Sequence, residues 1–264
     1  MKRIIYILLT ITMLTSAMFV TASCKKTGKL VCGVTEYDPM NYRENGEWVG
    51  FDTEFAKLVG DKLEMEVEFQ EIIWEQKYSE LESGSISCIW NGFTANASDD
   101  GVLRTDRVDM SYSYMLNMQC VIVKDDRYSE FTSIDALAGK TAAAEKGSAG
   151  EEAALGLIGD DGTFIGCAAQ VNAFIEVKSG AVDFAVVDIL LGQSIAGSGD
   201  YSDLVIANIP MDFEVYAVGF KKGDKLRDKV NDAMKELYDD GSLMQLAEKY
   251  GLENSLLLDT EFGK

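Results

Sequence analysis

The chain has 264 residues, of which 47% are hydrophobic, so it is long and apolar enough to fold into one large domain or two modest ones. With 24 Lys and Arg against 44 Asp and Glu, its net charge is −20, which disfavours binding to nucleic acid or to an anionic lipid surface. The absence of histidine excludes Ser-His and Cys-His catalysis and removes the commonest protein ligand for metals.

Residues 1–24 have the pattern of a signal peptide. Lys2 and Arg3 give a positive start, and residues 4–20 form an uncharged apolar run that ends in small residues. An uncleaved membrane anchor is the alternative, but about 17 apolar residues are at the short limit for a bilayer span. We therefore expect an exported protein.

The end of this segment resembles a bacterial lipobox. Small residues lead to Cys24, although Thr21 stands where such motifs usually have Leu. The resemblance implies that Cys24 carries a lipid and that residues 25–28 form a tether to the outer face of the membrane. Cleavage that leaves the protein free in the periplasm is the other outcome.

The remaining cysteines each lie inside an apolar run, and none forms a C-x-x-C pair. They are Cys32, Cys88, Cys120 and Cys167. This pattern favours buried free thiols, while a disulfide stays open because four cysteines allow three pairings. Without histidine or close cysteine spacing, a zinc site is not expected.

The first half of the chain alternates strands and helices. Strands are predicted at residues 29–34, 65–69 and 85–90, a helix opens at Phe51 with Asp52 as its N-cap, and a second helix covers residues 75–82. A turn at residues 45–46 indicates a small hairpin before the first helix. The alternation predicts a parallel, doubly wound sheet with right-handed crossovers.

The same alternation then begins again. Further strands are predicted at residues 119–124, 141–145, 164–168, 183–187, 204–209 and 215–220. Helices are predicted at residues 133–137, from 148, at 172–179, after 188, from 226 to Gly241, and at 243–250.

These elements predict an α/β fold of two doubly wound lobes joined by a hinge that the chain crosses twice. Lobe 1 is expected to contain residues 29–117 and 217–264, and lobe 2 residues 118–216. Because parallel strands present ligand sites at their carboxyl ends, the two lobes should face each other across a cleft lined by the residues that follow their strands.

The residues at these strand ends suit a free amino acid. They are Tyr37, Trp74, Asn91, Gly92, Phe93, Thr94, Arg104, Glu145, Ser148, Ala149 and Asp188. An arginine with backbone N–H groups at a helix start suits an α-carboxylate, a carboxylate suits an α-ammonium, and aromatic faces suit a side chain between them.

The order and spacing of several segments resemble the polar amino-acid family of periplasmic solute-binding proteins of ABC transporters, which have the type 2 periplasmic binding protein fold. The matching segments are residues 49–52, 88–94, 108–111 after Arg104, 134–140 and 147–148, Asp188, and residues 226–250. The resemblance covers nearly everything from Lys29 to Leu252 and implies a monomeric receptor that passes one amino acid to a membrane permease, with no cofactor.

The resemblance also implies roles for individual residues. Arg104 would bind the α-carboxylate, helped by the N–H groups of Thr94 and Ala149. Asp188, the Thr94 hydroxyl and the Gly92 carbonyl would bind the α-ammonium. The ligand side chain would lie between Tyr37 and Trp74, and the rest of the pocket would be lined by Asn91, Glu145 and Ser148.

Three assignments have alternatives. Residues 96–100 resemble a short insertion between Thr94 and Arg104, so Arg107 remains a second candidate for the carboxylate-binding arginine. Ser148 with Glu151 three residues later forms a capping box, which would occupy its hydroxyl locally. Tyr37 and Trp74 could instead be core aromatics.

The ligand's identity depends on Glu145. If this carboxylate points into the pocket, it favours a cationic amino acid such as lysine, arginine or ornithine, because an unpaired buried carboxylate is costly. Val34 stands where basic-ligand members carry Asp, so glutamine and cystine stay open.

Two other functions compete with transport. A cyclohexadienyl dehydratase-like enzyme would use Glu145 as its general acid, and a ligand-sensing surface protein would present the same site to another partner. In the transport interpretation the lobes close on the ligand, with residues of lobe 2 completing the site only when shut.

Overall fold

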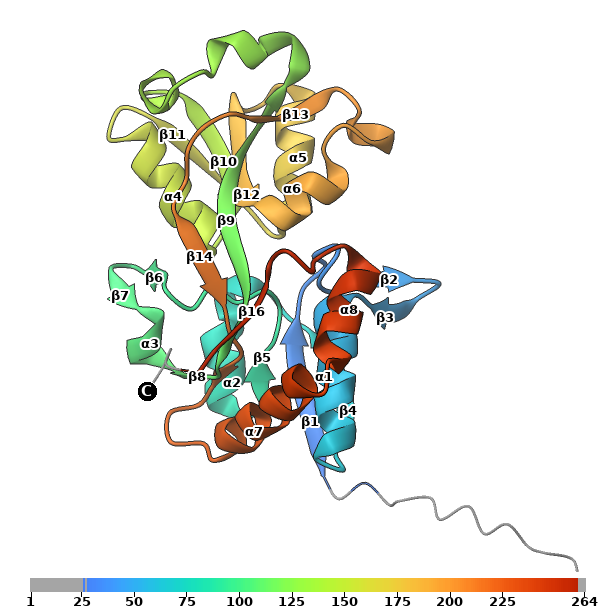
Figure 1. Cartoon of the computed structure of the whole chain (residues 1–264). Coiled ribbons are helices and arrows are strands. Elements are labelled where there is room, and N and C mark those ends of the chain that lie inside the picture. Colours follow the sequence, from blue (N-terminus) through green and yellow to red (C-terminus); the bar gives the residue numbers. More distant parts are fainter. Residues whose placement is uncertain (1–25, 27, 261–264) are drawn as a thin grey trace, which may run out of the picture.

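The computed structural model describes residue 26 and residues 28–260. The predicted signal peptide, Cys24 and most of the predicted tether lie outside these residues. The described chain forms two α/β lobes, one above the other in Figure 1, each built on its own sheet. This architecture confirms the predicted fold class.

The lower lobe in Figure 1 is formed by both ends of the described chain. Its first part contains β1 (Lys29–Val34), β2 (Tyr42–Glu44), β3 (Glu47–Val49), α1 (Phe51–Lys62), β4 (Glu66–Glu71), η1 (Trp74–Gln76), α2 (Lys77–Ser83), β5 (Cys88–Ile89), β6 (Ser98–Asp99), β7 (Val102–Leu103), α3 (Arg104–Arg107) and β8 (Asp109–Met110). Its last part contains β15 (Gly219–Phe220), α7 (Leu226–Asp239), α8 (Ser242–Tyr250) and β16 (Leu256–Asp259).

The sheet of this lobe has the order β4-β1-β5-β15-β8. Strands β4 and β5 both pair in parallel with β1, as the β-α-β-α-β pattern predicts. Helix α1 packs against the sheet through Phe51, Phe55 and Val59, which are fully buried and spaced four residues apart. The carboxyl ends of β1, β4 and β5 therefore point the same way, toward the other lobe.

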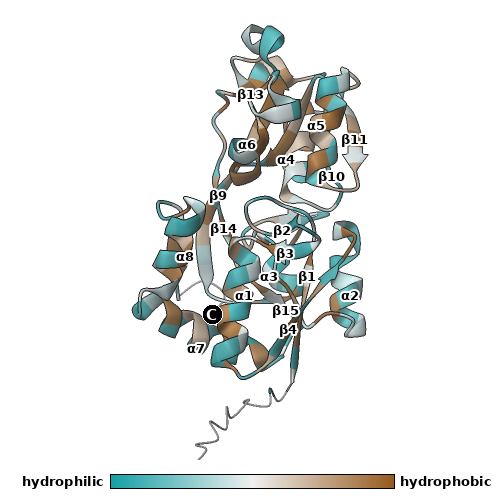
Figure 2. Ribbon diagram, turned by 90° about the vertical axis from the view of Figure 1, so that its right-hand side faces the viewer, coloured by the Kyte–Doolittle hydropathy of each residue, from teal (hydrophilic) through white to brown (hydrophobic). Residues whose placement is uncertain are grey.

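The upper lobe repeats this plan. It contains η2 (Asp125–Glu130), η3 (Ile134–Leu137), β10 (Thr141–Glu145), α4 (Ala149–Ile158), β11 (Thr163–Cys167), α5 (Gln170–Ser179), β12 (Phe184–Asp188), α6 (Ile189–Ile195), η4 (Gly199–Tyr201) and β13 (Leu204–Ala207). Strand β10 lies between β11 and β12, parallel to both, so their carboxyl ends face the lower lobe. In Figure 2 the strands carry long hydrophobic stretches, whereas the helices alternate hydrophobic and hydrophilic bands.

Two strands connect the lobes. The long strand β9 (Ser113–Lys124) pairs with β12 and β13 at one end, and with β14 (Phe213–Tyr216) and β16 at the other. The sequence predicted only residues 119–124 as a strand, because the lower half of β9 was expected to be the crossing itself. Backbone pairing with β14 makes the crossing a two-stranded ribbon.

Some local elements differ from the sequence predictions. Gly50, not Asp52, is the N-cap of α1, and Asp52 lies inside the helix, fully buried. The segment predicted as a helix at residues 133–137 is a single 3-10 turn, and the helix predicted at residue 75 begins as one. Strand β16 was not predicted.

The buried cysteines agree with their prediction as free thiols. All four are buried and free, and Cys32 lies beside Cys88 on the neighbouring strand with 3.8 Å between their sulfur atoms. Within residues 26 and 28–260, no helix has the length and apolar character needed to cross a membrane. The same residues contain no cluster of three Cys, Asp or Glu side chains that could hold a metal ion.

Candidate ligand-binding site

A small cavity lies between the carboxyl ends of the strands of the two lobes. Its volume is about 10 Å³, which is room for about one water molecule. It is lined by Trp74, Asn91, Gly92, Thr94, Arg104, Glu145, Ser148, Ala149, Gln170 and Asp188. Of the residues to which the sequence assigned a ligand-binding role, the structure thus brings together all but Tyr37, and Phe93 from the same strand ends is a buried core residue.

A larger cleft of about 710 Å³ opens beside it, between α4 and the segment before β14. Of the predicted residues, only Ala149 lines it. Its size reflects an open groove at the edge of the lobes, whereas the small cavity holds the buried charged groups. We therefore place the candidate site at the small cavity.

The lower wall of the cavity, which residues of the lower lobe form, depends on the buried carboxyl group of Asp52. Gly92 follows β5 with φ of 56°, a conformation that favours glycine, and a Cβ there would lie 2.6 Å from the ring of Tyr37. Its N–H donates to Asp52 Oδ2 at 2.7 Å, and the Tyr114 hydroxyl donates to the same oxygen at 2.9 Å. Burial raises the pKa of Asp52 to about 7. Asp52 therefore positions the backbone of the cavity wall.

Arg104 is the arginine that lines the cavity. It opens α3, is 1% exposed, and its guanidinium lies over the ring of Phe93. It donates to the carbonyl oxygens of Thr94 (3.0 Å) and Gly147 (3.3 Å), and it forms an ion pair with Asp99. The alternative, Arg107, lies over Tyr78 and outside the lining.

Lys77 is a second buried cation beside Arg104, and the sequence did not predict it. Its ammonium donates to the Gly147 carbonyl at 2.8 Å and lies 3.5 Å from Asp99. Burial and the charge of Arg104 lower the pKa of Lys77 to about 8. Because Gly147 belongs to the upper lobe, Lys77 and Arg104 both join the two lobes.

The upper wall carries the carboxylate of Glu145 at the end of β10. Glu145 is 3% exposed, and its Oε1 has no hydrogen-bond partner among the described residues. Burial, and then the charge of Asp188, raise the pKa of Glu145 to about 8. Ser148 is the N-cap of α4, and its hydroxyl accepts from the Glu151 N–H at 3.1 Å, so this hydroxyl is bound locally as the capping box predicted.

Asp188 ends β12 and lies among neutral amide donors. It accepts from Asn117 (2.6 Å), Gln119 (2.8 Å) and Gln170. Burial outweighs these hydrogen bonds and raises the pKa of Asp188 above its ordinary value. Gln170 follows β11, so the strand-end rule that selected the other residues could have selected it too.

Glu214, on the connecting strand β14, is an acidic neighbour that the sequence did not predict. It accepts from the Thr94 hydroxyl at 3.1 Å and from Asn117 and Gln119 at 3.0 Å each. Burial and the charge of Asp188 raise the pKa of Glu214 to about 7. No strand-end signal marks Glu214, because β14 belongs to the hinge and not to a β-α unit.

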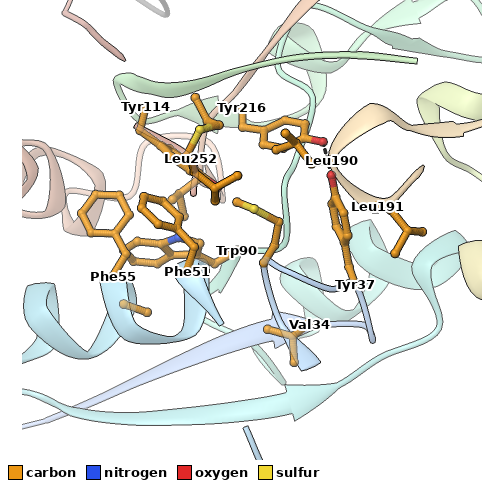
Figure 3. Close-up of a cluster of buried hydrophobic side chains, with 14 of the residues drawn as sticks. Val34, Tyr37, Phe51, Phe55, Trp90, Tyr114, Leu190, Leu191, Tyr216 and Leu252 are labelled. Carbon is orange, nitrogen blue, oxygen red and sulfur yellow. Dashed lines mark hydrogen bonds between the residues drawn. The ribbon is translucent and has the colours of Figure 1, made fainter. Parts of the chain in front are cut away.

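Of the two aromatic residues expected to sandwich a ligand, only Trp74 lines the cavity. Tyr37 is 1% exposed and lies in the core behind Gly92. Figure 3 shows its hydroxyl hydrogen-bonded to that of Tyr216, beside Leu190 and Leu191. Its place is that of the core aromatic named as the alternative.

The cationic and the acidic side chains around the cavity differ in whether they form ion pairs. The cations Arg104 and Lys77 both pair with Asp99. Within the part of the chain that the structure describes, Glu145, Asp188 and Glu214 form no ion pair. A buried carboxylate without a cation is costly, so this arrangement suits a ligand that brings positive charge.

Comparison with known proteins identifies one family. Residues 30–253 match the family described as bacterial extracellular solute-binding proteins, family 3. The arginine-binding extracellular protein ArtP of Bacillus subtilis (strain 168) is 29% identical over 84% of this chain and 86% of its own.

Two solved structures extend the comparison. An ancestral arginine-binding protein bound to arginine has a TM-score of 0.77 and 28% identity, covering 85% of this chain and 99% of its own. An ancestral amino-acid-binding protein described as a precursor of cyclohexadienyl dehydratase has a TM-score of 0.75 and 28% identity, covering 84% of this chain and 95% of its own.

Proposed function

The chain belongs to family 3 of the bacterial extracellular solute-binding proteins, and on that premise we propose that it captures one polar amino acid with a cationic side chain and delivers it to the permease of an ABC importer. The observation that carries the choice of ligand is a set of three carboxyl groups that form no ion pair among the described residues, the buried Glu145 and Asp188 and the partly buried Glu214. The arginine-binding names of ArtP and the ancestral protein support the same choice.

In this proposal the cavity, which has room for about one water molecule in this structure, widens to take the ligand, and the two ends of the ligand bind different groups. Its α-carboxylate binds Arg104, its α-ammonium binds Asp188 with the Thr94 hydroxyl, and its side-chain cation reaches Glu145. Trp74 lies against the aliphatic part of the side chain. Each of these groups lines the cavity.

Calorimetric titration against the twenty amino acids, ornithine and cystine tests the proposal. We expect binding of arginine, lysine or ornithine, with glutamine and cystine much weaker. Preference for a neutral amino acid would remove the cationic assignment, and the absence of binding to every compound would contradict the proposed function.

Binding is proposed to proceed by closure of the lobes around the hinge strands β9 and β14. Lys77 and Arg104 of the lower lobe bond to Gly147 of the upper lobe, and Ser98 bonds to Glu152 across the same gap. These contacts form only when the lobes are shut, so a ligand that adds contacts to both lobes favours the closed form. Small-angle scattering should show a smaller radius of gyration with ligand, and an unchanged radius would contradict closure.

Attachment to the membrane is a separate proposal that depends on Cys24. Mass spectrometry of the mature chain from cells should show an N-terminal lipid-modified Cys24, and Cys24→Ala should release the protein into the soluble fraction. A mature chain that begins beyond Cys24 would exclude the lipid anchor.

The second candidate function is catalysis of the cyclohexadienyl dehydratase type. The precursor protein among the structural neighbours, together with the pKa of about 8 at Glu145, favours considering it, because a protonated carboxyl in a cavity can act as a general acid. Incubation with prephenate or arogenate tests it. Formation of an aromatic product that Glu145→Gln abolishes would establish this activity.

A further inference from the structure

The carboxylate of Asp99 binds Arg104 in the way that a ligand's carboxylate would. Arg104 Nε and Nη2 both donate to Asp99 Oδ1, at 3.2 and 2.9 Å. We propose that Asp99 is an internal competitor for Arg104, which the α-carboxylate of the amino acid must displace, so that Asp99 sets the affinity of the site. The inference rests on the proposed function, and it assigns a role to a residue from the segment that resembles an insertion.

Asp99 is a strong competitor because three side chains hold it. Besides Arg104, Lys77 lies 3.5 Å from its Oδ2, and the Tyr78 hydroxyl donates to the same oxygen. Burial alone would raise the pKa of Asp99, but the charges of Arg104 and Lys77 outweigh burial and hold the pKa below its ordinary value. The carboxylate is therefore ionised, and it is the ion-pair partner of both cations that a ligand's carboxylate would need.

The donors of Arg104 leave no room for a second carboxylate. A guanidinium has five N–H groups, and the bonds to Asp99, the Thr94 carbonyl and the Gly147 carbonyl use four of them. Bidentate binding of a ligand carboxylate needs two. Gly147 leaves Arg104 when the lobes open and returns when they shut, so in the closed complex either Asp99 or Thr94 must give up its bonds before an amino acid can bind Arg104 in this way.

Of Asp99 and Thr94, Asp99 can leave at the lower cost. It belongs to a hairpin in which β6 and β7 have two residues each, joined by Asp100 and Gly101, both with positive φ. So short a hairpin has little stability of its own, and β7 is exposed. Thr94, by contrast, is part of the buried wall, and its backbone bridges to Tyr216.

The structure also provides a place for the displaced carboxylate. A cleft of about 460 Å³ lies beside the hairpin, and Lys77, Tyr78 and Arg107 line it. Arg107 Nη2 already binds the Asp99 backbone carbonyl at 2.7 Å, while its buried Nε has no partner among the described residues. Asp99 can turn from Arg104 toward Arg107 and keep a cationic partner. The two arginines thus have different roles, one for the ligand and one for Asp99.

Titration of Asp99→Asn with the same amino-acid panel tests the inference. The amide keeps the shape of the side chain but removes its charge, so every amino acid that binds the wild type should bind the variant about tenfold more tightly, which corresponds to about 1.4 kcal/mol. Asp100→Asn is the matched control, since Asp100 is exposed in the same hairpin and should leave affinity unchanged.

Agmatine, which is arginine without its α-carboxylate, separates competition from a general charge effect. It has no carboxylate to place on Arg104, so Asp99→Asn should not tighten its binding, and loss of a negative charge should weaken it slightly. Arg107→Gln should weaken arginine binding in the wild type and have less effect in the Asp99→Asn background.

Three results would overturn the inference. Asp99→Asn could bind amino acids no more tightly than the wild type, or it could tighten agmatine and arginine equally. Agmatine could also bind the wild type more tightly than any amino acid and lose binding in Asp99→Asn, which would make Asp99 a permanent counter-ion. Failure of the proposed function would look different, because no amino acid would bind the wild type, Asp99→Asn or Asp100→Asn.

Discussion

The two walls of the cavity differ in whether their buried charged side chains form ion pairs. On the lower wall, Arg104 and Lys77 share the carboxylate of Asp99, and the three form a compact group of ion pairs. On the upper wall and the hinge, Glu145, Asp188 and Glu214 have, among residues 26 and 28–260, only neutral hydrogen-bond donors or none. On one wall a carboxylate of the chain itself partly balances the two cations, and on the other wall a ligand can balance the carboxyl groups.

Because of this difference, the positive charge and the α-carboxylate of an amino acid should bind to different walls. A cation entering the cavity is attracted to the upper wall, where its charge restores the ionised state of carboxyl groups whose pKa burial has raised. An α-carboxylate can bind Arg104 at the lower wall only by displacing Asp99. The upper wall therefore attracts the positive charge of the ligand, and the lower wall selects for compounds that carry an α-carboxylate.

The largest expected effect comes from changing the lower wall at Arg104. Arg104→Lys keeps the charge but loses the planar pair of donors, so amino-acid affinity should fall roughly hundredfold or more. Calorimetry with arginine measures it, and Arg227→Lys, on the surface of α7, is the control. If Arg104→Lys binds like the wild type, the lower wall does not hold the α-carboxylate.

Changing Asp188 tests the upper wall at the carboxylate that accepts hydrogen bonds from three amide side chains. Asp188→Asn removes the negative charge and places an amide against the amides of Asn117, Gln119 and Gln170, so affinity for every amino acid should fall about thirtyfold. Circular dichroism should confirm that the variant is folded. Retention of affinity would show that the α-ammonium binds elsewhere.

Glu145→Gln sharpens the comparison by separating charge from shape. Affinity for arginine and lysine should fall about tenfold, while that for glutamine should stay the same or rise, because only a cationic side chain needs the carboxylate. The comparison of cationic and neutral ligands is internal to the experiment. An equal loss for all three would place Glu145 at the α-ammonium instead.

Arginine binding should also depend on pH through Glu145. Its pKa of about 8 reflects burial and Asp188, with Lys77 and Arg104 acting in the opposite direction. A bound cation favours the ionised carboxylate, so binding below about pH 8 should release a proton, and affinity should rise as pH increases toward about 8. Calorimetry in buffers with different ionisation enthalpies measures the release, which Glu145→Gln should reduce.

The sequence predicted the fold and most of the cavity lining because both follow from one rule. Strands in β-α units have their carboxyl ends at one edge of the sheet, and residues such as Thr94 and Asp188 are found by counting to those ends. The rule does not apply to Glu214, which lies on a hinge strand, or to Lys77, which reaches the site through a long side chain.

Two further residues show where local patterns mislead. Asp52 near a helix start resembles an N-cap, but its helix begins earlier and the side chain turns inward to Gly92 and Tyr114. Asp99 lies in a hairpin whose strands have two residues each, too short for any periodic signal. In both cases tertiary contacts decide the role.

The last prediction concerns stability instead of ligand affinity, and it is made at Asp52, behind the lower wall of the cavity. In the unfolded chain this carboxyl loses its proton near pH 4, whereas in the folded protein it keeps the proton until about pH 7. The unfolded state is therefore favoured as pH rises between these values, by up to about 1.4 kcal/mol per pH unit for one group. Asp52→Asn removes this contribution, so its urea midpoint should fall less than that of the wild type between about pH 5 and about pH 8. Asp61→Asn, exposed on the same helix, should keep the wild-type dependence, and an unchanged slope in Asp52→Asn would show that the buried carboxyl is not protonated.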